Sequence, residues 1–80
     1  MSLDIEVKFN EKENAWVIIP VGEIDIYTSP KIKEILFESL EEKNSNILID
    51  GEKLDYIDST GLGVLIIILK KVRESENHIK

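Results

Sequence analysis

The sequence has no cysteine, few aromatic residues and a shortage of basic side chains. The lack of cysteine excludes disulfides, thiolate zinc sites and cysteine nucleophiles. Trp16 and the two tyrosines are too few and too scattered to suggest an aromatic ligand box. Ten Lys and Arg stand against 16 Asp and Glu, giving a formal charge of −6. This balance argues against direct binding to nucleic acid or an anionic membrane, which need clustered basic side chains. A basic partner remains open.

Long hydrophobic runs and targeting signals are also missing. The longest apolar stretch, residues 62–69, is interrupted by Gly63 and is far shorter than the ~18 residues of a membrane span. Residues 1–10 lack the basic start and apolar run of a signal peptide. What is present, 80 residues that are 42% hydrophobic and 32% charged, is typical of one small globular domain. We therefore expect a soluble, cytoplasmic protein.

The first half of the chain predicts a hairpin followed by a helix. Apolar and polar residues alternate strictly over residues 3–10, which indicates a half-buried strand. Residues 11–14 form a polar turn and residues 15–21 a second, antiparallel strand. A helix then begins with Ser29 as its N-cap and Pro30 at its first position, and ends at residues 44–45.

The second half predicts a buried strand and a very apolar helix. Residues 47–49 are typical of a parallel strand after a crossover helix, and residues 52–58 are expected to be a loop. A helix over residues 62–73 follows, with an N-cap signal before it and basic residues at its end. The fold class is therefore α/β with the order β-β-α-β-α. Because so short a chain offers little cover for this helix, we expect exposed apolar surface on residues 62–72 and self-association.

The most specific cluster is residues 56–63, Tyr-Ile-Asp-Ser-Thr-Gly-Leu-Gly. It puts two hydroxyls at the start of a helix, followed by two glycines that allow close backbone approach. One interpretation is structural, with Ser59 as the N-cap and the glycines serving packing. The other is a phosphorylation site, because a phosphate there would meet free N–H groups and the positive end of the helix dipole. Asp58 would oppose that charge, so the phosphate would affect a docked partner more than the fold.

A second cluster, Gly22-Glu23-Ile24-Asp25, follows the second strand. If the second and third strands are parallel neighbours joined by the first helix, this turn and residues 58–59 lie at one edge of the sheet. The alternative is an ordinary solvated turn.

Residues 21–30 together with residues 55–64 resemble the bacterial anti-sigma factor antagonist family, which has the STAS fold. The two motifs, their separation and the order of elements all match. The resemblance implies a partner-switching regulator. In that family the unmodified antagonist binds an anti-sigma factor that is also a serine kinase, which frees the sigma factor. The kinase phosphorylates the antagonist and a serine phosphatase restores it, so the antagonist is a substrate, not an enzyme, and needs no cofactor.

The resemblance also implies a set of site residues. Ser59, directly after the motif Asp, is the phosphoacceptor, and Thr60 is a second hydroxyl open to modification. Family members continue past the second helix with another strand and helix, whereas this sequence stops at Lys80. We therefore expect a single STAS-like domain over residues 1–80 that is incomplete at its C-terminus. The implied partner-binding residues are Glu23, Asp25, Asp58, Thr60, Gly61 and Leu62.

Three other functions compete with this one. An enzyme with Ser59 as nucleophile needs a base, but the single histidine, His78, lies in a polar tail. A second alternative is a Mg²⁺ site or a phospho-aspartate receiver, suggested by the three carboxylates of Asp50, Asp55 and Asp58. The first strand, however, lacks the acidic pair that a receiver needs. The third alternative is an unmodified STAS interaction module within a larger signalling or transport-associated complex.

Overall fold

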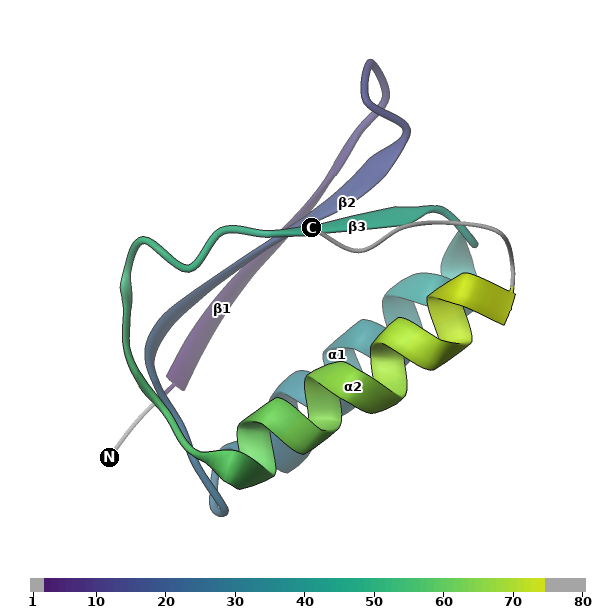
Figure 1. The fold of residues 1–80 in the computed structure, drawn as a ribbon. Coiled ribbons are helices and arrows are strands. Elements are labelled where there is room, and N and C mark those ends of the chain that lie inside the picture. The colour runs from purple at the N-terminus through teal and green to yellow at the C-terminus, as the bar shows by residue number, and fades with distance from the viewer. Residues whose placement is uncertain (1–2, 75–80) are drawn as a thin grey trace.

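Two helices lie on one face of a mixed four-stranded sheet in a computed structural model that describes residues 3–74 (Figure 1). The sheet and its helices thus form two layers, as expected for an α/β fold. The elements in chain order are β1 (Leu3–Asn10), β2 (Ala15–Ile24), α1 (Ser29–Glu42), β3 (Asn46–Ile49), β4 (Leu54–Ile57) and α2 (Ser59–Glu74).

Strand β2 is the centre of the sheet. It pairs antiparallel with β1 along its length, which confirms the predicted hairpin. On its other side β2 pairs in parallel with β3 as far as Ile18, and then with β4 from Gly22 onward. Pro20 falls between these two paired segments. A central strand therefore accommodates a residue that has no N–H to donate.

The prediction of a loop over residues 52–58 is wrong, because Leu54–Ile57 forms β4. Glu23 pairs with Tyr56 after a bulge that follows Gly22. Gly22 has a φ of 118°, a conformation that favours glycine, and this lets β2 bend from one parallel partner to the next. The order of elements is therefore β-β-α-β-β-α.

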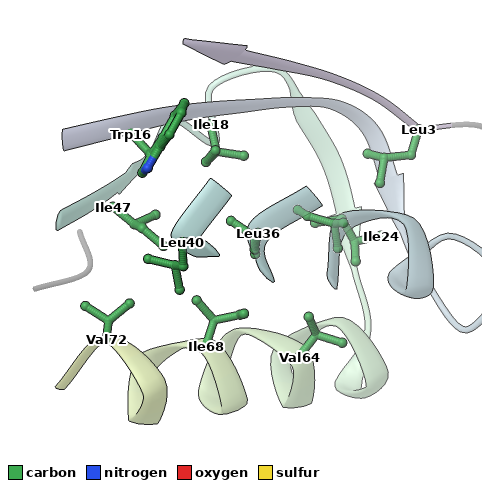
Figure 2. Close-up of a cluster of buried hydrophobic side chains, with 11 residues drawn as sticks. Leu3, Trp16, Ile18, Ile24, Leu36, Leu40, Ile47, Val64, Ile68 and Val72 are labelled. Carbon is green, nitrogen blue, oxygen red and sulfur yellow. The ribbon is translucent and has the colours of Figure 1, made fainter. Parts of the chain in front are cut away.

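The core lies between the sheet and both helices. Leu36 and Leu40 of α1 share it with Val64 and Ile68 of α2, which point toward the sheet (Figure 2). Trp16 fastens the C-terminal end of α1, because its indole Nε1–H donates to the Lys43 backbone oxygen at 2.8 Å. The buried cluster comprises Leu3, Trp16, Ile18, Ile24, Ile32, Leu36, Leu40, Ile47, Val64, Ile68 and Val72.

Helix α2 buries only one of its faces. Its buried residues, Gly61, Val64, Ile68 and Val72, recur every three or four positions, as expected for a helix packed on one side. Its outer side keeps large apolar residues exposed, among them Ile66 at 54%. The predicted exposed apolar surface is therefore confirmed. Within residues 3–74, no helix is long and apolar enough to cross a membrane.

The predicted starts of both helices shift slightly. Helix α1 begins at Ser29, with Thr28 as the N-cap, so Ser29 is the first helical residue rather than the cap. Helix α2 begins at Ser59, three residues before the predicted start. The reason in both cases is that several residues in succession can cap a helix, so the sequence alone does not fix which one does so.

Candidate functional site

The candidate site lies where β2 and β4 end side by side and α2 begins (Figure 1). Ile24 pairs with Ile57, the last residue of β4. The next backbone N–H, that of Asp58, donates to the Ile24 oxygen at 3.0 Å. The turn after β2 and the start of α2 therefore meet at one edge, as predicted, although β4 rather than β3 brings them together.

Asp58 is the N-cap of α2. Its Oδ1 accepts a hydrogen bond from the Gly61 backbone N–H at 3.0 Å, and its backbone oxygen accepts one from Leu62 at 3.0 Å. A carboxylate in this position satisfies an unpaired donor and complements the positive end of the helix dipole. Such a cap stabilises a helix by about 0.5–2 kcal/mol relative to alanine.

Because Asp58 caps α2, the Ser59 hydroxyl is not needed to cap the helix. Ser59 and Thr60 are both exposed, and neither hydroxyl makes a hydrogen bond to any other residue between 3 and 74. The structural interpretation of Ser59 as the N-cap is therefore wrong. Ser59 is instead an accessible hydroxyl on the first residue of a helix, where the backbone N–H groups of the first turn attract an anion.

Gly61 is buried and allows α2 to begin directly against the sheet. A Cβ at this position would lie 2.6 Å from Ile24 Cγ2 and 2.8 Å from Ile57 Cγ1. At Gly63, by contrast, a Cβ would meet nothing within 4 Å. Gly61 was predicted to bind a partner, and its buried position means that it can do so only indirectly, by placing Ser59 and Thr60.

Asp25 also points inward, with only 3% of its surface exposed. Its Oδ1 accepts hydrogen bonds from the backbone N–H groups of Tyr27 and Thr28 at 2.8 and 3.0 Å. The Thr28 hydroxyl donates to the Glu23 backbone oxygen at 2.8 Å and accepts from the Asp25 N–H at 2.9 Å. These bonds hold the backbone of the turn between β2 and α1 in place. Asp25 therefore supports the site from inside the protein rather than from its surface.

The pKa of Asp25 is set by two opposing causes. Burial raises it, but hydrogen bonds from the backbone N–H groups of Thr28 and Tyr27 outweigh burial and hold the pKa below the usual 3.8. The stability that this carboxylate contributes is present above pH 3.8 and is lost as the pH falls through the lower folded-state value.

We therefore expect the free energy of unfolding of the wild type to fall more steeply below about pH 4 than that of Asp25→Asn. Urea unfolding at a series of pH values, followed by the fluorescence of the single tryptophan, Trp16, measures this. Parallel pH profiles for the two proteins would contradict the assignment.

Two buried carboxylate oxygens at the site lack a partner within residues 3–74. They are Oδ2 of Asp25 and Oε2 of Glu23. Buried acceptors without a donor are costly.

Four exposed apolar side chains lie at this end of the molecule, and of these only Leu62 was predicted from the sequence to bind a partner. We call them the Ser59 rim: Ile26 (63% exposed), Tyr27 (81%), Tyr56 (53%) and Leu62 (50%). Ile26 and Tyr27 follow Asp25 in a turn, so they project outward when Asp25 points inward. The Asp-x-x-Thr spacing of Asp25 and Thr28 was a usable signal, because an Asp side chain often accepts from the backbone two and three residues ahead.

The carboxylates considered for a metal site do not converge. Asp50 Oδ1 accepts from the Glu52 backbone N–H at 3.0 Å, which holds the turn before β4. Within the described part of the chain, no three His, Cys, Asp or Glu side chains are grouped closely enough to hold a metal ion. His78, the base considered for a serine enzyme, lies outside the described residues.

Comparisons with known proteins agree with this architecture. The family model of the STAS domain matches residues 6–78. An anti-sigma-B factor antagonist of Listeria monocytogenes is 38% identical over 80 residues, covering 99% of this chain and 68% of that protein. An anti-sigma factor antagonist from Mycobacterium paratuberculosis superimposes with a TM-score of 0.85 at 20% identity, covering 98% of this chain and 66% of the other.

The Bacillus cell fate determinant SpoIIAA, in its phosphorylated form, has the same fold. It superimposes with a TM-score of 0.75 at 17% identity, covering 95% of this chain and 68% of its own. A central β2 with parallel partners and two helices on one face is therefore the architecture of a STAS domain. The chain belongs to the STAS-domain family of bacterial anti-sigma factor antagonists.

Proposed function

We propose that this protein is an anti-sigma factor antagonist that binds an anti-sigma factor serine kinase and is inactivated by phosphorylation of Ser59. The observation that carries the proposal is the exposed Ser59 hydroxyl, which Asp58 frees by capping α2 itself. The Listeria relative is named as an antagonist of anti-sigma-B factor, and the SpoIIAA neighbour exists in a phosphorylated form. The first supports the antagonist role, and the second supports a regulator that can be phosphorylated.

The docking surface consists of Ser59, Thr60 and the Ser59 rim. Burying the rim on contact supplies hydrophobic free energy, to which aromatic side chains contribute most. Glu23, which is half-buried at the same edge, adds a negative charge that fits a basic partner. Asp25 and Gly61 act by holding the turn and the start of α2 in register.

The modification is a phosphoryl transfer. Ser59 Oγ attacks the γ-phosphorus of ATP held by the kinase, the Oγ–P bond forms, and the bond to the ADP oxygen breaks. The hydroxyl proton passes to a base of the kinase. The phosphate brings about −1.5 to −2 charges into a close-packed interface, where a desolvated charge without a partner is unfavourable. The complex dissociates, and hydrolysis by a serine phosphatase restores the binding form.

Intact mass measured after incubation with the cognate kinase and ATP tests this proposal. We expect the wild type to gain one phosphate group and Ser59→Ala to gain none. Thr60→Ala is the matched control, because it removes the neighbouring exposed hydroxyl and keeps Ser59, and we expect it still to gain one phosphate group at completion.

A wild type that stays unmodified by a kinase that modifies a longer relative would contradict the proposal. If such a protein still bound the kinase, it would be the unmodified STAS interaction module instead. A phosphate that persists in Ser59→Ala but disappears in Thr60→Ala would move the site by one residue.

A further inference from the structure

The outer face of α2 carries a line of residues that begins at Ser59 and continues along the helix beyond the Ser59 site. Ser59, Gly63, Ile66 and Lys70 follow one another at spacings of four, three and four, which places them on one side of the helix. This line is opposite to the buried one, and Ile66 is 54% exposed. No charged residue occurs from position 59 to position 69. The face is therefore uncharged over about three turns.

This face is complementary to a copy of itself. Gly63 leaves a flat position, since a Cβ there would meet nothing within 4 Å, and Ile66 and Ile67 project from the next turn. Two α2 helices laid antiparallel would place Ile66 of each copy over Gly63 of the other. Such a reciprocal contact is what a two-fold interface requires, and glycine lets the two helices approach closely.

The charges at the two ends of α2 favour the same arrangement. The register that places Ile66 over Gly63 also places Lys70 of one copy opposite Ser59 of the other, next to Asp58. Lys70 and Arg73 are exposed at the C-terminal end, while Asp55 and Asp58 flank the N-terminal end. A parallel pair would instead align like charges. The attraction between these basic and acidic ends thus favours the antiparallel orientation. It opposes the overall repulsion between two chains that each carry a charge of −6.

We propose that a second copy of this chain docks on α2, forming an antiparallel homodimer in which Ile66 packs over Gly63 and Lys70 faces the Asp58–Ser59 helix start. The dimer itself does not depend on the proposed function. The effect of the dimer on phosphorylation does rest on the proposed function. Because the interface covers Ser59, a kinase and a second copy would compete for the same face. The antagonist would then limit its own modification at high concentration.

Sedimentation equilibrium over a wide concentration range tests the dimer. We expect the mass to rise from 9.2 kDa toward twice that value. Ile66→Lys should weaken association by at least about tenfold, because it buries a charge without a partner. Val21→Lys is the matched control: Val21 is 38% exposed on β2, pairs with Asp4, and receives the same added charge. We expect it to associate like the wild type.

Disulfide trapping tests the register. The chain has no cysteine, so only introduced thiols can react. When Gly63→Cys and Ile66→Cys are mixed and oxidised, we expect the mixed disulfide to form faster than either symmetric one. Faster symmetric disulfides would overturn the antiparallel register. A constant mass of 9.2 kDa at all concentrations would overturn the dimer and leave this face to the kinase or to another partner.

Discussion

Ser59→Asp is expected to weaken binding to the anti-sigma factor kinase by at least about 30-fold, whereas Ser59→Ala should bind at least as tightly as the wild type. A buried interfacial charge without a partner costs about 2–5 kcal/mol, and each 1.4 kcal/mol is a factor of ten in Kd. Alanine removes only an exposed hydroxyl that makes no hydrogen bond within residues 3–74. The two substitutions therefore separate the docking surface from the switch that acts on it.

Titration calorimetry with the purified kinase in the presence of ADP measures both affinities without phosphoryl transfer. Asn10→Asp is a suitable control, since it adds the same charge at the other end of the sheet. Its Oδ1 accepts from the Glu13 N–H at 3.1 Å, and aspartate can keep that bond. Equal Kd values for Ser59→Asp and Ser59→Ala would rule out a charge-driven switch.

The same substitution should act in the opposite direction on the homodimer. In the antiparallel register, a negative charge at Ser59 faces Lys70 of the second copy and attracts it. Ser59→Asp would therefore tighten self-association at low salt while it weakens kinase binding. Ser59→Asp is thus expected to change the two affinities in opposite directions. An unchanged self-association would count against the dimer, and an unchanged kinase affinity would count against the partner switch.

The elements that the sequence predicted well are those with local signals. Strict alternation in β1 and the apolar stripe of α1 each define an element from its own residues. Strand β4 has no such signal, because Leu54-Asp55-Tyr56-Ile57 is short and exposes its two middle residues. It is a strand only because β2 continues past the Gly22 bulge and offers a second parallel edge. A pairing between residues so distant in sequence has no local pattern.

The site was predicted in position but not in orientation. Sequence spacing brought the 22–25 turn and residues 58–59 to one edge, and the hydrogen bond from Asp58 to Ile24 confirms this. Asp58 and Ser59 are both good N-caps, so the residue that caps could not be chosen without the backbone path. Asp25 was expected to face a partner. Its inward orientation depends on the Asx-type turn closed by Thr28, whose exposed side is apolar.

The fit of Gly61 against the strand ends makes Gly61→Ala the substitution with the largest expected effect on stability. The added Cβ would lie 2.6 Å from Ile24 Cγ2, and Ile24 is buried in the core with 1% exposure. Overpacking of this kind costs about 1–3 kcal/mol. Gly63→Ala is the matched control in the same helix, and because its Cβ meets nothing within 4 Å it should gain about 0.5–1 kcal/mol from helix propensity.

Urea unfolding followed by Trp16 fluorescence gives both free energies, and the two variants should differ by roughly 1.5–4 kcal/mol. The consequence reaches the site, because a shift of the start of α2 away from Ile24 and Ile57 would relieve the Gly61 overlap. Ser59 moves with it, so Gly61→Ala should also slow phosphorylation under conditions in which the protein remains folded. Equal stability of the two alanine variants would mean that the side chains of Ile24 and Ile57 make room without cost, and Gly61 would then have no part in placing Ser59.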